Sequence, residues 1–198
     1  MVNDGPNDKI EGLRREAACC QACPLWKDAT QTVFGEGRQD AEIMLVGEQP
    51  GDREDREGRP FVGPAQSAPG GGVDRKRVYV TNAVKHFKLE PRGKRRLHKR
   101  PSASEIGICR RWLFQEIEAI SPRLIVARGA TAAQGLTGRT ILVQSNRGSL
   151  LTVDEGLRAT IHPSALLRLQ DEEEKRSGYA SFVNELRSIE RLVDYDPR

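Results

Sequence analysis

Four short apolar runs constrain the architecture of this chain, because each has the composition of a strand. They are residues 41–46, 78–81, 124–127 and 157–161. Near-continuous apolar runs are typical of strands that are buried on both faces of a parallel sheet. Helices are expected between and around them, at 9–19, 102–120 and 129–136. Alternating strands and helices predict an α/β fold: a three-layer α/β/α sandwich with a central, mainly parallel four-stranded sheet.

Polar residues follow or close three of these runs. Glu48 follows the first run, Asn82 closes the second, and His162 follows the fourth. Open α/β sheets bind their ligands along the carboxyl ends of the strands. The sequence therefore predicts a site at this edge of the sheet.

The turn after the first strand, residues 47–52 (GEQPGD), contains two glycines and a proline. Such a turn brings the backbone close to a ligand and directs Glu48, Gln49 and Asp52 into the site. An ordinary strand-to-helix turn with polar surface side chains is the alternative. Phe61 follows, between glycines and prolines; it is either a core anchor or a platform on which a base stacks.

A basic segment, residues 85–100, comes directly after the second strand. Its sixteen residues carry a formal charge of +7 in a chain whose total is +4, so the remainder carries −3. Positive charge this concentrated predicts contact with a polyanion. Pro91 and Gly93 interrupt any helix and the charge excludes a core strand, so we expect a surface loop, with His98 inside it. A solvated face or an address signal is the alternative interpretation.

The cysteines are clustered rather than spread. Cys19, Cys20 and Cys23 lie together, and Cys109 is distant. A secreted disulfide framework normally distributes an even set of cysteines along a short chain. In a reducing compartment, a C-x-x-C pair can instead place two sulfurs on one metal site. The pattern indicates a metal or cluster site.

Length and composition fit one globular domain. With 198 residues, 37% hydrophobic and 30% charged, we expect a single domain over 1–198 that is frayed at 1–8 and 194–198. No apolar run reaches the ~20 residues that span a bilayer. The polar N-terminus lacks the apolar core of a signal peptide. These features predict a cytoplasmic, monomeric protein that does not bind membranes.

Local patterns predict several further elements. Ser102 and Glu105 form a capping-box pattern at the start of a helix that ends before Pro122. A hairpin is expected over 141–153, around the NRG turn at 146–148. Three more segments are expected as a loop at 66–72, a solvated acidic patch at 171–174 and a final helix at 179–192.

Taken together, these features resemble the uracil-DNA glycosylase superfamily, specifically its iron–sulfur branch and, within that branch, the UdgX group. The motifs occur in order: CxxCPL at 20–25, TQxVFGEG at 30–37, GEQPG at 47–51, GRPFVG at 58–63, TN at 81–82 and HPS at 162–164. Two features favour the UdgX group. Gln49 occupies a position where other members more often have Ala, and the inserted loop KRRLH at 94–98 looks like the group's basic loop with a histidine.

The resemblance implies excision of uracil from DNA, with single-stranded DNA preferred, in DNA repair. The target nucleotide must leave the base stack, and contacts in the site offset that cost. Phe61 would stack on the extruded uracil and Asn82 would read its polar edge. His162 and the backbone at Glu48 and Gln49 would stabilise the departing uracil anion and the cationic sugar. Further implied residues are Asp52 in catalysis, and Gly47 and Arg168 in substrate binding.

The resemblance to UdgX further implies that His98 attacks the sugar carbon and leaves the protein covalently attached to the abasic site. Phosphate contacts would come from Lys94, Arg95, Arg96, Lys99, Arg100 and Ser164. Two alternatives remain open. One is a conventional turnover glycosylase without an adduct, and the other is a DNA-binding or lesion-sensing module without catalysis.

The cofactor implied by the resemblance is a [4Fe-4S] cluster, usually held by four cysteines. Cys20, Cys23 and Cys109 fit three ligand positions. His86 stands where other members carry the remaining cysteine, so it is the proposed fourth ligand. Zn2+ on the same set is the alternative cofactor, and Cys19 is the alternative fourth ligand.

One segment departs from the family pattern. Between residues 65 and 73, relatives carry a longer amphipathic helix that flanks the pocket. This chain is shorter there by roughly a turn and a half of helix. The difference bears on stability, on closure of the pocket and on activity.

Overall fold

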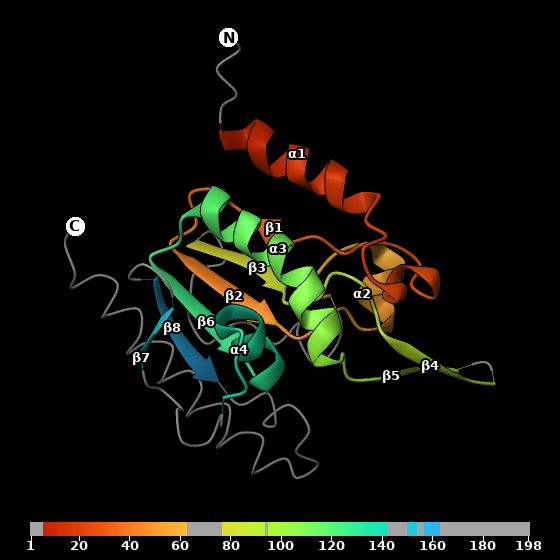
Figure 1. The fold of residues 1–198 in the computed structure, drawn as a ribbon. Helices are drawn as coiled ribbons and strands as arrows, with labels where there is room; N and C mark the ends of the chain where they lie inside the picture. The colour runs from red at the N-terminus through yellow and green to blue at the C-terminus, as the bar shows by residue number, and fades with distance from the viewer. Residues whose placement is uncertain (1–5, 63–76, 94, 142–149, 154–156, 163–198) are drawn as a thin grey trace, which may run out of the picture.

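The computed structural model describes residues 6–62, 77–93, 95–141, 150–153 and 157–162. These residues form a six-stranded sheet with the order β1-β3-β2-β6-β8-β7 (Figure 1). Its strands are β1 (Glu36–Gly37), β2 (Ile43–Gly47), β3 (Val78–Asn82), β6 (Leu124–Arg128), β7 (Leu150–Val153) and β8 (Leu157–His162). Strands β3, β2, β6 and β8 are parallel, and β1 and β7 pair antiparallel at the edges. The predicted four-stranded parallel sheet is confirmed, with one antiparallel strand added on each side.

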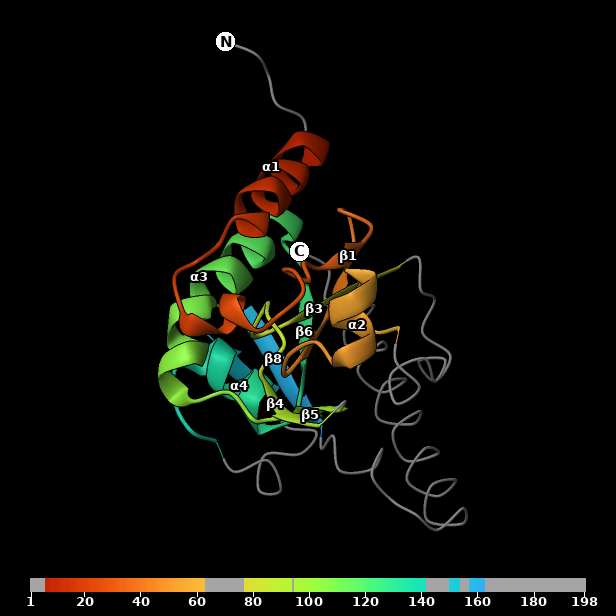
Figure 2. The same cartoon turned by 90° about the vertical axis from the view of Figure 1, so that its right-hand side faces the viewer.

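Helices cover both faces of this sheet. They are α1 (Pro6–Ala18), α2 (Asp52–Glu57), α3 (Ala103–Ile120) and α4 (Ala130–Thr137), with a short 3-10 helix η1 (Pro24–Lys27). The edge-on view shows α1, α3 and α4 on one side of the sheet and α2 on the other (Figure 2). The predicted α/β/α layering is therefore confirmed.

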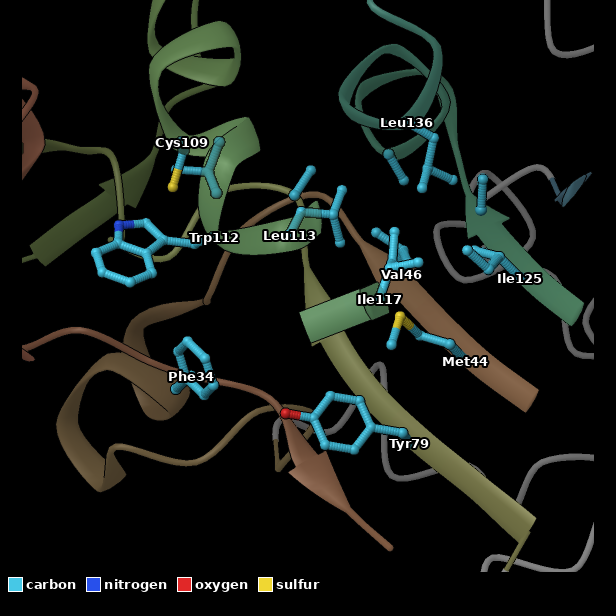
Figure 3. Packing of buried hydrophobic residues seen from close by; sticks show 14 of the residues in the cluster. Phe34, Met44, Val46, Tyr79, Cys109, Trp112, Leu113, Ile117, Ile125 and Leu136 are labelled. Carbon is cyan, nitrogen blue, oxygen red and sulfur yellow. The ribbon is translucent and has the colours of Figure 1, made fainter. Parts of the chain in front are cut away.

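The larger apolar cluster lies between the sheet and the helices α1, α3 and α4. Because side chains alternate along a strand, every second residue faces these helices. Figure 3 shows Met44, Val46, Tyr79 and Ile125 of the strands with Leu113, Ile117 and Leu136 of the helices. The opposite face carries a second cluster of Ile43, Val78, Leu124 and Val126. Two buried faces explain why the strands are apolar without interruption.

The long helix α3 begins and ends where the sequence predicts. The Ser102 hydroxyl accepts a hydrogen bond from Glu105 N at 3.3 Å, and the Glu105 carboxylate accepts one from Ser102 N at 2.6 Å. This is the predicted capping box, which satisfies two backbone donors at the helix start. The helix ends at Ile120 and is capped by Ser121, which has a left-handed φ of 50° and precedes Pro122.

The basic segment is not the predicted loop. It contains an antiparallel hairpin of β4 (Leu89–Arg92) and β5 (Arg95–His98), in which Leu89 lies opposite His98. Gly93 in the turn has a φ of 60°, a left-handed conformation that glycine adopts without strain. The loop prediction was wrong because dense charge excludes a strand from the core but not from a hairpin at the surface.

The hairpin predicted over 141–153 lies mostly outside the described residues and stays a prediction. Strand β7 pairs antiparallel with the next strand, β8, with Leu150 opposite Thr160. Residues 142–149, with the expected NRG turn, lie outside the described residues, as do 66–72, 171–174 and the predicted helix 179–192. None of the described helices is long and apolar enough to span a bilayer.

Candidate active site

Four neighbouring strands end in one row at the carboxyl edge of the sheet. Gly47 of β2 pairs with Asn82 of β3, and Arg128 of β6 pairs with His162 of β8. The residues that precede Gly47 and Arg128 lie opposite each other, which puts both at the same level. The strand ends that were expected to converge thus lie side by side. Arg128 joins them, although no motif pointed to it.

Gly47, Asn82 and Phe61 pack around one point. A Cβ at Gly47 would lie 2.3 Å from Asn82 Oδ1 and 3.2 Å from Phe61 Cζ, so the contact requires glycine. Asn82 is 1% exposed, and its Oδ1 has no hydrogen-bond partner among the described residues. A buried carbonyl oxygen without a donor is costly. This oxygen is therefore an acceptor that a ligand N–H can satisfy.

Phe61 has an unusual backbone and unusual neighbours. Its φ is 59°, which is rare for a bulky residue and is the kind of strain found at functional sites. The ring is buried but belongs to neither apolar cluster of the described residues. Instead, the guanidinium carbon of Arg128 lies 5.2 Å from the ring centroid. These observations favour a platform for a base over a core anchor.

Glu48 and His98 meet at the same edge. Glu48 Oε1 lies 3.3 Å from His98 Nε2, in an orientation that makes no regular hydrogen bond, and Oε2 accepts one from Thr131 Oγ1 at 2.8 Å. Burial raises the pKa of Glu48, but His98, Thr131 and the charge of Arg100 outweigh it and hold this pKa below its usual value. The imidazole therefore lies beside an ionised carboxylate. The His98 side chain is 44% exposed, so a substrate can reach it.

The Gln49 side chain makes hydrogen bonds to the backbone at both ends of the hairpin. It is 3% exposed, and its Oε1 accepts a hydrogen bond from Lys88 N at 3.0 Å. Its Nε2 donates to Lys88 O at 3.2 Å and to Lys99 O at 3.1 Å. One carboxamide thus fixes both strands where the hairpin begins and ends. The predicted backbone role of Gln49 in catalysis stays a prediction.

Arg96 anchors the hairpin to α2. Its guanidinium forms ion pairs with Asp52, at 2.9 Å, and with the fully buried Asp55, and it lies 5.3 Å from the Phe87 ring centroid. Asp52 and Asp55 are three residues apart on a helix, so they share one face. The i, i+3 spacing from Asp52 is the sequence signal that identifies Asp55 as a second carboxylate on this face, although Asp55 is in none of the motifs. The contacts give Arg96 and Asp52 a positioning role, and the phosphate contact of Arg96 and the catalytic role of Asp52 stay predictions.

The other predicted phosphate ligands fall into two groups. Arg95, Lys99 and Arg100 are exposed on or beside β5 and are accessible to a polyanion. Lys94 and Ser164 lie outside the described residues. So does Arg168, predicted to bind the substrate, and His162, predicted to act in catalysis, is described by its backbone alone.

Three of the predicted metal ligands interact electrostatically: Cys20 and Cys23, which follow α1, and Cys109 within α3. Burial and the nearby thiols Cys23 and Cys20 raise the pKa of Cys109 to about 11, although Lys85 lowers it. Cys20 accepts a hydrogen bond from the Trp112 indole N–H at 3.2 Å. Burial raises the pKa of Cys20, but donors including the Ala22 N–H, Trp112 and Arg111 outweigh it and lower the pKa. Among the described residues, no three His, Cys, Asp or Glu surround a point where one ion could bind.

His86 is buried, and its Nε2 lies 3.0 Å from Thr32 Oγ1. The Thr32 hydroxyl donates its hydrogen to Ala17 O at 2.9 Å, so it must accept from Nε2–H of His86. The tautomer assigned in this way leaves the lone pair on Nδ1, as a metal ligand requires. Burial lowers the pKa of His86, which keeps the ring neutral.

A buried polar network underlies β3, and no sequence motif indicated it. Lys85 Nζ lies 2.5 Å from Glu116 Oε2 and donates to Asn82 O at 2.8 Å and to Thr81 Oγ1 at 2.6 Å. Glu116 also accepts from Gly35 N at 2.8 Å. The backbone N of Lys85 donates to Cys109 Sγ at 3.2 Å. Lys85 thus connects Cys109 with the strand end that carries Asn82.

The chain belongs to the uracil DNA glycosylase superfamily, whose family model matches residues 34–187. Its relatives include a type-4 uracil-DNA glycosylase of Thermotoga maritima, 38% identical over 165 residues, which are 79% of this chain and 82% of that protein. A type-4 uracil-DNA glycosylase of Pyrobaculum aerophilum is 36% identical over 163 residues, 75% of this chain and 80% of the relative. Another, of Sulfurisphaera tokodaii, is 40% identical over 128 residues, 62% of this chain and 55% of the relative.

Proposed function

We propose that this protein is a uracil-DNA glycosylase of DNA repair that takes uracil out of single-stranded DNA and cleaves its glycosidic bond. The observation that carries the proposal is the buried Asn82 Oδ1, without a donor among the described residues, beside the Phe61 ring and the glycine at position 47. The oxygen would accept the N3–H of uracil while the ring stacks on the base. Superfamily membership and the names of the relatives support the same reaction.

The proposal extends to covalent capture by His98, as in the UdgX group. When the C1′–N1 bond breaks, the bonding pair leaves with uracil and positive charge develops on the sugar. A ring nitrogen of His98 then donates its lone pair to C1′, and the imidazolium that forms releases its remaining N–H proton to solvent water. Glu48, 3.3 Å from His98 Nε2, stabilises both cations, since an ionised carboxylate opposes developing positive charge.

The geometry of the hairpin supports this role for His98. Gln49 fixes both ends of the hairpin and Arg96 ties β5 to α2, so His98 is carried on a braced element. Bracing of this kind reduces the entropy lost on reaching the reactive arrangement. The exposed Arg95, Lys99 and Arg100 would bind the DNA phosphates, with affinity that falls as salt rises.

A denaturing gel tests the proposal. Incubation with a uracil-containing single-stranded oligonucleotide is expected to give a slower band that survives SDS. His98→Ala should abolish this band, and exposed Arg92→Ala, on β4 of the same hairpin, serves as the matched control. Wild type that releases uracil without the band would identify a turnover enzyme. Salt-sensitive DNA binding without base release would identify a binding module and overturn the proposal.

We also propose a [4Fe-4S] cluster held by Cys20, Cys23, Cys109 and His86. The donor set fits: three thiols interact electrostatically, and the His86 tautomer leaves a lone pair on Nδ1. The cluster would hold α1, the segment after β3 and α3 together, a structural role. Zn2+ on these ligands, or Cys19 in place of His86, remains the alternative.

Metal analysis of the purified protein tests the cofactor. A brown protein with stoichiometric iron and sulfide is expected, and His86→Ala should lower its iron content while Cys19→Ala should not. A colourless protein with one zinc would contradict the cluster. Full iron in His86→Ala with loss in Cys19→Ala would move the fourth ligand to Cys19.

A further inference from the structure

Arg128 is a shielded cation to which the proposed mechanism assigns no role. It lies at the end of β6 and is largely shielded from solvent, and burial lowers its pKa. Among the described residues, the Phe61 ring is the partner found for its guanidinium, 5.2 Å from the ring centroid. No carboxylate of the described residues neutralises it.

A shielded cation of this kind favours an anionic ligand. Arginine remains protonated in proteins, so the site carries a full positive charge. Burying a charge without a counter-ion is costly, and the cation–aromatic contact returns only about 0.5–2 kcal/mol of that cost. An anion that forms beside Arg128 would therefore be stabilised strongly.

The register of the sheet puts this cation among the residues of the site. Arg128 pairs with His162 on one side and lies level with Gly47 on the other. Phe61 contacts both, through its Cζ toward Gly47 and its ring face toward Arg128. The guanidinium thus lies on the side of the site that receives the base.

The charges are arranged with opposite signs at the two ends of the bond that breaks. Glu48 lies beside His98, where the proposed reaction places the cationic sugar. Arg128 lies beside Phe61, where it places the base. A site whose charges oppose those that develop in the transition state accelerates the reaction.

We propose that Arg128 is a catalytic residue that stabilises the departing uracil anion. The inference rests on the proposed glycosylase function. When the C1′–N1 bond breaks, the bonding pair remains on N1 and spreads to the O2 and O4 oxygens of the base. The guanidinium keeps its protons and lowers the energy of this anion through its positive charge.

Single-turnover excision with two bases tests the inference. Arg128→Met keeps the apolar length of the side chain and removes the charge, and we expect about a 10²-fold slower release of uracil. With 5-fluorouracil, a more acidic leaving group, the loss should be several-fold smaller. Arg128→Lys should retain part of the rate, and the exposed Arg139→Met should behave like wild type.

For a folded Arg128→Met, any other pattern of rates overturns the inference. An equal loss for both bases would mean that Arg128 only supports the packing of Phe61. A loss confined to DNA affinity and its salt dependence would assign Arg128 to a phosphate. If Arg128→Met does not fold, as judged by thermal unfolding, the same two-base comparison is made with Arg128→Lys. If wild type releases neither base, the proposed glycosylase function itself is refuted. The wild-type measurement thus separates a failure of that function from a failure of the inference about Arg128.

Discussion

At the scale of single residues, Gln49 shows how a side chain of the turn after β2 shapes a distant segment. Its carboxamide makes three hydrogen bonds to the backbone of Lys88 and Lys99, which are 39 and 50 residues away. Only an amide can donate to two carbonyls and accept from an N–H at once. Gln49 therefore has the hydrogen-bonding groups needed to hold the hairpin that carries His98.

We expect Gln49→Ala to lower the free energy of unfolding by about 1–3 kcal/mol, because it leaves partly buried backbone groups unsatisfied. It should also slow adduct formation by loosening the hairpin. Urea unfolding and the gel assay measure the two effects. Gln21→Ala, at an exposed position, is the control. Equal stability of the two variants would show that the carboxamide does not brace the hairpin.

Glu48 should make stability depend on pH. Its pKa in the folded protein is lowered, so its ionised form contributes stability above the unfolded pKa, ~4.3, and this contribution is lost as pH falls through the folded value. Glu48→Gln should therefore be less stable than wild type at neutral pH, with the difference shrinking in acid. Urea unfolding across this range tests it, with exposed Glu90→Gln as control. A difference independent of pH would contradict the assignment.

At the scale of elements, the hairpin β4–β5 is held by ion pairs and hydrogen bonds rather than by an apolar core. Arg96 reaches Asp52 and Asp55 of α2, and Lys88 Nζ lies 2.7 Å from Glu105 at the start of α3. The sheet that it forms has two strands and is separate from the main sheet. A two-stranded hairpin is only marginally stable by itself, so these contacts decide its position.

Arg96→Lys should loosen the hairpin, because an ammonium cannot bind two carboxylates with the planar fork of a guanidinium. We expect faster amide hydrogen exchange in β4 and β5 and a slower adduct reaction, with global stability nearly unchanged. Arg92→Lys, exposed on the neighbouring strand of the hairpin, is the matched control. Unchanged exchange in Arg96→Lys would exclude a bracing role.

At the scale of the whole molecule, the buried pair Lys85–Glu116 connects α3, β3 and the segment before β1. Both side chains are at most 1% exposed, and Glu116 also accepts hydrogen bonds from Gly35 N and Tyr79 Oη. Burial and the charge of Glu116 raise the pKa of Tyr79, which therefore remains a donor. Removing one charge leaves the other buried and unpaired.

Lys85→Met should therefore destabilise the protein by about 3–5 kcal/mol. Adding Glu116→Leu should recover part of this loss, because the second change removes the unpaired carboxylate. Denaturant unfolding of the single and double variants measures the coupling, with exposed Lys27→Met as control. A double variant less stable than the sum of its parts would contradict this account.

The sequence by itself determined the parallel strands and the start of α3, because these features depend on residues close together in the chain. Apolar runs predicted the parallel strands, and Ser102 with Glu105 predicted the start of α3, because burial patterns and caps are set within a few residues. The order of strand-end residues predicted which edge of the sheet carries Gly47 and Asn82.

Tertiary structure alone decided which side chains meet across long separations. The basic segment became a hairpin because Gln49, Asp52 and Asp55 supply its partners from another part of the chain. Arg128 has no motif of its own, and only the register of β6 with β8 and the path of the chain to Phe61 place its charge in the site. Pairing and ion contacts between distant segments depend on the packed fold, so no local pattern records them.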